Sequence, residues 1–320
     1  MQVLPLVVVG ELNADIVVSL DGPPTFGQDE QIVRSTEVVL GSSSAITACG
    51  AAKMDVPTSL VSVVGDDLLG RFLLQRLTAA AVDASPCRVE PQTPTGTSTI
   101  LALANGERSI LTAMGTIGLV TVADVPDALI TPGAHVHVGS YFLQDGLRDD
   151  LGAFFADCRA RGLTTSLDPN DDPHREWDSG LADVLPHTDV FFCNVDEALA
   201  IAGSDEVAAA EDWFAMRMHA GAELVVKHGA DGAAVALIGD RAVAVRHNVA
   251  PSPSQDPLVD TVGAGDSLAA GYLAARLRGS APERCLRVGV ANGTASTRAV
   301  GGTAGQLSWE EAESVTSNPA

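Results

Sequence analysis

The stretch Asp260-Thr261-Val262-Gly263-Ala264-Gly265-Asp266 governs both the expected fold and the expected chemistry of this chain. It is followed at once by small and apolar residues over 267–277, a pattern typical of a helix that begins directly after a glycine turn. Gly263 and Gly265 carry no Cβ, so successive backbone N–H groups can point into one concavity at the positive end of that helix. The stretch therefore predicts an anion-binding loop.

Asp266 places a carboxylate in this loop, where it would repel a bound phosphate if the loop did nothing but hold an anion. A carboxylate has a use there if it removes a proton from a hydroxyl group that then attacks a phosphoryl group. The amides of Gly263, Ala264 and Gly265 would stabilise the charge that develops during transfer. The loop thus favours phosphoryl transfer with Asp266 as general base.

Composition narrows the class of protein. A chain of 320 residues that is 46% hydrophobic can bury a substantial core as one large or two small domains. Its formal charge of −22, from 19 basic and 41 acidic residues, argues against nucleic acid or an anionic membrane as partner. The first nine residues do not resemble a secretory signal, and no apolar run is long enough to span a membrane. We therefore expect a cytoplasmic protein. Five scattered cysteines favour buried free thiols over disulfides or a zinc site.

Strands and helices alternate along most of the chain, beginning with the continuous apolar run 4–9 that is typical of a buried parallel strand. This alternation predicts an α/β fold whose sheet is mostly parallel and has helices on both faces. The expected strands of the main body are 4–9, 59–64, 135–138, 164–167, 190–193, 224–226 and 233–238, and the expected helices are 42–52, one ending at 77, 149–161, 208–219, 266–278, 284–299 and one from 308.

A second pattern interrupts the first. Residues 16–20 and 31–40 alternate between apolar and polar, and so do 97–103 and 108–113 on either side of the turn Asn105-Gly106. We expect these four short strands to form a small inserted sheet. The lid comprises 13–40 and 95–114, and the kinase core comprises 1–12, 41–94 and 115–320. A lid suits phosphoryl transfer because the reaction needs water excluded.

Polar residues follow several expected strands at their carboxyl ends, where open α/β sheets bind ligands. Asn13 and Asp15 follow the first strand, and they are equally common as plain turn residues. Asn194 and Glu197 follow 190–193 and share a helical face that suits hydrated Mg²⁺. A helix N-terminus with no ligand explains that pair equally well.

Lys227 is one of only two lysines, and it stands beside Gly229 and Gly232 in what is either an ordinary hairpin or a contact for a nucleotide phosphate. His135 and His137 share one strand face, and such a pair can bind a metal ion. The sequence shows no evident third ligand, so a metal site is not expected there. Neither a Walker motif nor a complete dinucleotide fingerprint follows the first strand, which disfavours a dehydrogenase.

In their order, the motifs resemble those of ribokinase-like (PfkB-type) carbohydrate kinases over essentially the whole chain. The matching stretches are Gly10-x-x-Asn13-x-Asp15, Gly65-Asp66-Asp67-x-x-Gly70, Asn194-x-x-Glu197, Lys227-x-Gly229-x-x-Gly232, Asp260 to Asp266, and Ala291-Asn292. The resemblance implies a three-layer sandwich with a β lid and an ATP- and Mg²⁺-dependent kinase that phosphorylates a hydroxyl of a monosaccharide or related small polyol.

The resemblance also implies roles for individual residues. Asp266 would be the base and residues 263–265 the anion hole. The remaining roles are as follows: Asn13, Asp15, Gly41 and Ser42 at the sugar; Asn194, Lys227, Gly229, Gly232 and Asn292 at the nucleotide; Glu197 at Mg²⁺ through water; and Asp260 with the Val262 carbonyl at a monovalent cation such as K⁺. The lid of such kinases often forms a homodimer.

One motif departs from the family pattern. The early sugar-binding motif usually has two glycines and, four residues after the second, an asparagine, whereas this chain has Ser42 and Ile46 at the second glycine and the asparagine. Ile46 cannot form an amide's hydrogen bonds, which argues against ribose but not against phosphoryl transfer. Two alternatives remain open at this point: a nucleoside kinase of the same fold, for which the lid holds only Phe26 as an aromatic, and a sugar-binding regulator without catalysis.

Overall fold

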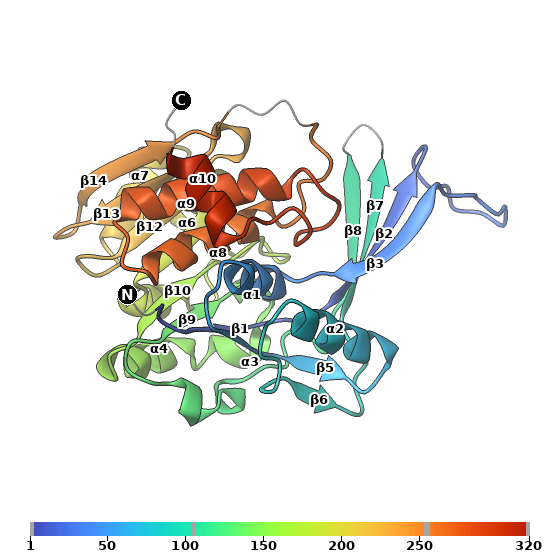
Figure 1. Ribbon diagram of the computed structural model, residues 1–320, viewed down its shortest axis with the longest axis horizontal. Coiled ribbons are helices and arrows are strands. Elements are labelled where there is room, and N and C mark those ends of the chain that lie inside the picture. The colour runs from blue at the N-terminus through green and yellow to red at the C-terminus, as the bar shows by residue number, and fades with distance from the viewer. Residues whose placement is uncertain (1–2, 104–106, 253–256, 318–320) are drawn as a thin grey trace.

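The computed structural model describes residues 3–103, 107–252 and 257–317, and a large mixed sheet runs through its centre (Figure 1). Strands β1, β4 and β9 to β12 run parallel, whereas β13 and β14 are antiparallel to their neighbours. In sheet order the strands are β14 (Val243–Val249), β13 (Ala233–Ile238), β12 (Glu223–Lys227), β11 (Val190–Asn194), β10 (Thr164–Leu167), β9 (His135–Val138), β1 (Leu6–Val9) and β4 (Thr58–Val61).

The two faces of this sheet build two separate apolar cores. Successive residues of β1 alternate between them: Leu6 and Val8 belong to one core, and Val7 and Val9 to the other. One face is covered by α1 (Ser43–Lys53), α2 (Leu68–Ala79), α8 (Ala264–Arg276), α9 (Pro282–Ser296) and α10 (Trp309–Ser317). The other is covered by α3 (Asp145–Arg148), α4 (Leu151–Ala160), α5 (Leu181–Val184), α6 (Val195–Ala202) and α7 (Val207–Ala215). The predicted three-layer α/β sandwich is confirmed.

A separate four-stranded sheet stands beside the main body (Figure 1). Its order is β3 (Ser35–Leu40), β2 (Ala14–Leu20), β7 (Thr97–Leu103) and β8 (Arg108–Ala113). All four strands fall within the segments that the sequence assigns to the lid. The second strand of the first predicted pair is shorter than expected, because β3 begins at Ser35 rather than at residue 31. The predicted turn Asn105-Gly106 lies outside the described residues.

Two predictions for the main body need correction. The single strand expected over 59–64 is two strands, because the chain leaves the main sheet at Ser62 and β5 (Val63–Gly65) pairs instead with β6 (Arg88–Glu90). β14 was not expected at all. It is a half-exposed edge strand with polar residues and a register shift, and its apolar alternation is therefore weak.

The carboxyl ends of the parallel strands share one edge of the sheet, where the polar residues singled out by the sequence lie at the ends of β1, β11 and β12. The N-terminus of α8 meets the same edge. All five cysteines are free, as expected, and only Cys87 is not fully buried. No helix in the described ranges has the length and hydropathy to cross a membrane.

Candidate active site

The loop before α8 has the geometry of an anion nest. Gly263 adopts φ 71°, and the helix begins at the next residue. A Cβ on Gly263 would lie 2.7 Å from Cα of Gly302 and 2.9 Å from Cδ1 of Ile46, so only glycine fits both the conformation and the space. The first turn of an α-helix leaves its backbone amides without intrahelical partners, and α8 begins within the loop that the sequence proposes for anion binding.

Asp266 lies in that first turn and is partly exposed. Its Oδ1 accepts a hydrogen bond of 2.5 Å from Oγ of Ser43, at the start of α1. Desolvation and the nearby carboxylate of Asp168 raise the pKa of Asp266 to about 6, against the opposing effects of Lys227 and Ser43. A carboxylate with this pKa is a proton acceptor well matched to neutral pH.

Asp260 fixes the start of the loop. Its two carboxylate oxygens accept backbone N–H groups from Val262 and Gly301, each at 2.9 Å. These bonds join the loop to the segment that follows α9. The residues proposed from the sequence for a monovalent cation, Asp260 and Val262, are therefore adjacent and rigidly held.

The expected sugar side lies where β1 passes into the lid. Asn13 donates from Nδ2 to Oδ1 of Asp15 at 2.9 Å, and both side chains are buried. Asp15 packs directly on Gly41, where a Cβ would overlap its carboxylate at 2.0 Å. Desolvation raises the pKa of Asp15 to about 7, in spite of the Asn13 hydrogen bond. Ser42 differs from the expectation, because its hydroxyl donates to the carbonyl of Glu11 and caps α1.

Lys227 lies at the centre of a group of carboxylates. Its Nζ forms an ion pair of 2.7 Å with Asp168, which is 1% exposed, and lies 3.3 Å from where a Cβ of Gly265 would be. Burial alone would lower the pKa of Lys227, but Asp168, Glu197 and Asp266 together raise it above its ordinary value. Its ammonium group is therefore charged and adjoins the anion nest. The sequence did not predict its pairing with Asp168, a residue 59 positions away.

Asn194 and Glu197 form a reciprocal cap at the start of α6. Asn194 accepts the backbone N–H of Glu197, while Glu197 accepts both the backbone N–H and the side-chain amide of Asn194, all at 2.7 to 2.8 Å. Burial raises the pKa of Glu197 to about 7, although Lys227 opposes the shift. The pair is thus a helix cap that also adds a buried carboxylate to the site.

The residues expected at the nucleotide divide into two kinds. Gly229 is exposed and has nothing within 4 Å of a Cβ position, and Gly232 adopts φ 93° against the backbone of Val249. Asn292 is fully buried, and its amide is bonded at both ends, to the Ser267 carbonyl at 2.6 Å and the Leu307 N–H at 2.8 Å. Gly229 borders open space, Gly232 is buried against the Val249 backbone, and Asn292 holds α9 against α8.

The two histidines of β9 belong to a buried hydrogen-bond chain rather than to a metal cluster. Ser166 lies 2.7 Å from both His135 Nε2 and His137 Nδ1. Burial lowers the pKa of His137 to about 4. Among the described residues no group of three or more His, Cys, Asp or Glu side chains is placed to hold a metal ion by itself.

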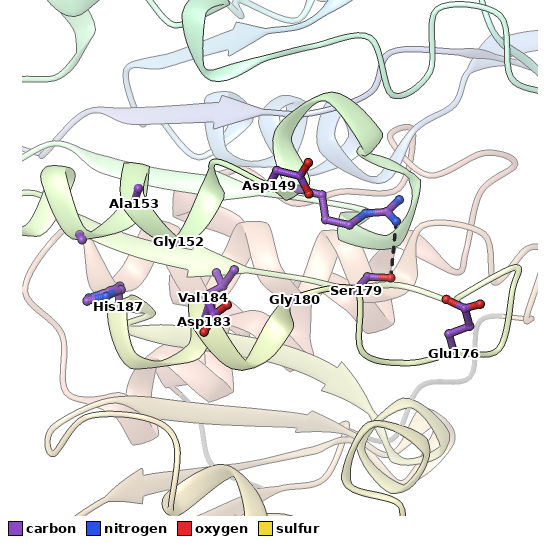
Figure 2. Close-up of a pocket in the computed structure, with 11 residues that line it drawn as sticks. Asp149, Gly152, Ala153, Glu176, Ser179, Gly180, Asp183, Val184 and His187 are labelled. Atoms are coloured by element: carbon purple, nitrogen blue, oxygen red, sulfur yellow. Dashed lines mark hydrogen bonds between the residues drawn. The ribbon is translucent and has the colours of Figure 1, made fainter.

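A depression of about 820 Å³ lies elsewhere, between α4 and α5 (Figure 2). Arg148 reaches Ser179 across it at 3.5 Å, and Asp149, Glu176 and Asp183 contribute carboxylates. None of the predicted site residues lines it. The candidate active site is therefore the sheet edge at α8 and not this depression.

A comparison with known families decides what kind of protein has this site. The sequence profile described as pfkB family carbohydrate kinase matches residues 4–309. The chain belongs to the pfkB family of carbohydrate kinases. The fold and the order of the motifs along the chain agree with this assignment.

One relative supports the same family assignment, and one solved structure shares the fold. An ATP-dependent ribose-1-phosphate kinase of Halopiger xanaduensis is 31% identical over 278 residues, covering 87% of this chain and 86% of the relative. The structure of Arabidopsis thaliana ribokinase complexed with ribose and ATP superposes with a TM-score of 0.82 at 20% identity, covering 99% of this chain and all of the other. At that identity the likeness shows the fold alone.

The candidate active site is thus assembled from segments far apart in the chain. The structure brings Asp266, residues 263–265, Lys227 and Glu197 to one edge of the sheet, with Asn13 and Asp15 at the lid junction. Sequence reasoning missed Ser43 and gave Asp168 no role, because their partners are distant in the chain. The run of three serines that starts at Ser42 was the one signal in the sequence that pointed to Ser43.

Proposed function

We propose that this protein transfers the γ-phosphoryl group of ATP to a hydroxyl of a monosaccharide or related small polyol. The single observation that carries the proposal is Asp266, a partly exposed carboxylate in the first turn of α8, beside a glycine nest and with a pKa raised to about 6. A base and an oxyanion site that adjoin one another are what in-line transfer to an alcohol needs.

The steps follow from the positions of the side chains. The acceptor hydroxyl lies between Asp266 and the lid junction, where Asn13 and Asp15 bind neighbouring hydroxyl groups. Asp266 takes the proton of the acceptor hydroxyl. At the same time the oxygen of that hydroxyl bonds to the γ-phosphorus, and the bond between the γ-phosphorus and the β-phosphate oxygen breaks. The first-turn amides and the Lys227 ammonium stabilise the charge on the transferring group. The lid, comprising 13–40 and 95–114, excludes water.

The net negative charge at this edge also suits a divalent cation held through water. Asp168, Glu197 and Asp266 place more negative charge at this edge than Lys227 neutralises, and oxygen ligands with few carboxylates suit hydrated Mg²⁺. Glu197 would hold it through water, with Asn194 beside it. When bound, Mg²⁺ neutralises phosphate charge.

The nucleotide occupies the neighbouring strand ends in this proposal. Gly229 leaves room for it, Gly232 shapes the adjoining turn with φ 93°, and Asn292 contributes by holding α8 in place. Asp260 and the Val262 carbonyl would bind K⁺. The test is whether KCl stimulates turnover relative to choline chloride at equal ionic strength.

The acceptor class is open to direct measurement. We propose a sugar other than ribose, because Ile46 packs against Gly263 and Gly302 and offers no amide at the sugar side. The ribose-1-phosphate kinase relative makes phosphorylated sugars part of the same test. An ADP-release screen should therefore cover pentoses, hexoses, sugar acids, sugar 1-phosphates and nucleosides.

The decisive variant is Asp266→Asn. It should leave ATP binding measurable and lower turnover about a hundredfold or more, the scale expected for loss of a general base. Asp149→Asn, on the unrelated depression between α4 and α5, is the matched control. Turnover of Asp266→Asn close to that of the parent would refute the assignment.

A nucleoside kinase is disfavoured because the described lid presents no aromatic ring toward the sheet edge; Phe26, its one aromatic, is fully exposed. A regulator without catalysis would bind sugar and release no ADP from ATP. The intact Asp266 and its nest argue against it.

We further propose that the lid forms a homodimer. Its outward face carries the cross-strand row Val38, Ile16, Thr99 and Leu111, and the two end members are 44% and 57% exposed. The opposite face carries Asp15 and Ser98 toward the active site. An apolar outer face on a small sheet is typical of a surface that a partner covers.

A further inference from the structure

Ser43 touches the proposed base directly. It is the first residue of α1 and is 7% exposed, and its hydroxyl donates to Oδ1 of Asp266 at 2.5 Å. Within the described ranges this is the only hydrogen bond to the carboxylate of Asp266, so Oδ2 has no protein partner there. The contact joins residues 223 positions apart, and it orients the carboxylate from outside the loop that carries it.

The same face of α1 holds the rest of the loop. Thr47, one turn further along, donates to the backbone carbonyl of Asp266 at 3.3 Å. Between them, Ile46 packs against Gly263 and Gly302. The spacing of these three residues puts them on one side of the helix. The Ser43 bond is therefore supported by a packed surface and does not depend on one mobile side chain.

The charges around Asp266 show why a donor at this point matters. Asp168 from the end of β10 and Glu11 from the end of β1 both disfavour its ionised form, and Lys227 from β12 favours it. Asp15 at the lid junction and Glu197 on α6 add further negative charge that Asp266 interacts with. A hydroxyl that donates to the carboxylate stabilises its ionised form, which is the form that accepts a proton.

We propose that Ser43 is a positioning residue that fixes Oδ1 of Asp266, so that Oδ2 faces the acceptor hydroxyl and takes its proton. The proposal rests on the proposed function of Asp266. During transfer the proton of the acceptor moves to Oδ2, and Ser43 keeps its own proton throughout. Ser43 therefore contributes to kcat through the orientation and ionisation of the base.

The test is the pH dependence of kcat/KM in Ser43→Ala, measured with the acceptor found in the screen. Removing a donor to a charged group should move the acid limb, which we place near pH 6, upward by about one pH unit and lower kcat/KM at pH 6 roughly fivefold. Turnover at pH 8 should fall less. Ser43→Thr, which keeps the hydroxyl, should restore the limb.

Thr47→Val is the matched control, because it removes the neighbouring bond to the backbone of Asp266 and leaves the carboxylate bond intact. Its acid limb should stay in place. If Ser43→Ala does not fold, Ser43→Cys keeps the volume with a weak donor and should show the same upward shift.

The outcomes separate the two proposals. Parent-like turnover in Asp266→Asn would overturn the proposed function and this inference with it. Loss of turnover in Asp266→Asn together with an unmoved acid limb in Ser43→Ala would overturn only the role of Ser43. A fall in kcat by the same factor at every pH that Ser43→Thr shares would also overturn that role, because the effect would not depend on the hydroxyl.

Discussion

Three consecutive serines at the start of α1 bond to three different groups. Ser42 bonds to the backbone of Glu11, Ser43 to the carboxylate of Asp266, and Ser44 to the carboxylate of Glu11 at 2.7 Å. Successive helical residues point about 100° apart, so neighbours in sequence reach different walls of one site. The serine that replaces the family's second glycine is used to cap α1, and the next serine reaches the base.

Lys227 provides the sharpest prediction at this scale. Lys227→Met should reduce the free energy of unfolding by about 3–5 kcal/mol, because it leaves the buried Asp168 carboxylate without its partner. In the double variant with Asp168→Asn most of that stability should return, since the Asp168 charge that lost its ion-pair partner is removed as well. Urea unfolding measures both values.

Turnover distinguishes a structural lysine from one that acts on the phosphoryl group. We expect kcat to stay low in the double variant even though its stability recovers, because the positive charge beside Gly265 is gone. A double variant with parent-like kcat would show that Lys227 serves only the fold.

At the scale of elements, the sequence predicts well what local periodicity determines. The four lid strands alternate, and β1, β11, β12 and β13 contain continuous apolar runs, so these strands were expected close to where they lie. β5 and β6 were not predicted as a separate pair, since leaving the main sheet at Ser62 is decided by tertiary pairing. Contacts such as those of Ser43 and Asp168 join separate elements, and no local pattern encodes them.

The outward face of the lid makes a prediction about assembly. Leu111→Glu should convert a dimer into a monomer, because it places a charge in the exposed apolar row that the partner would cover. Val245→Glu is the matched control, since Val245 is 46% exposed on β14, away from the lid. Light scattering after size exclusion gives the mass of each.

If the parent is already a monomer at high concentration, the lid does not form the proposed dimer. If both variants dissociate alike, the interface is not the Leu111 row.

The whole molecule combines a formal charge of −22 with a cluster of carboxylates at one edge of the sheet. Exposed charges repel one another, and salt screens that repulsion; at about 1 M the Debye length is roughly 3 Å. The carboxylates of the candidate active site are different. Asp15, Glu197 and Asp266 have pKa values raised mainly by burial, so holding them ionised opposes folding at neutral pH. The site that performs the chemistry is therefore a source of instability for the fold.

Asp15→Asn tests this linkage. The folded pKa of Asp15, about 7, is above its unfolded value of 3.8, so the folded state holds the extra proton and this group's stability is lost as pH rises through 7. The substituted amide keeps an oxygen to accept from Asn13 and has no charge. The variant should therefore exceed the parent in free energy of unfolding by on the order of 2 kcal/mol at pH 8 and by little at pH 4. The buried histidines titrate equally in both proteins and cancel in the difference. Denaturant unfolding at the two pH values measures this difference. In about 1 M KCl, salt should stabilise both proteins and leave the difference at pH 8 intact. A difference that salt abolishes would place Asp15 among the exposed charges.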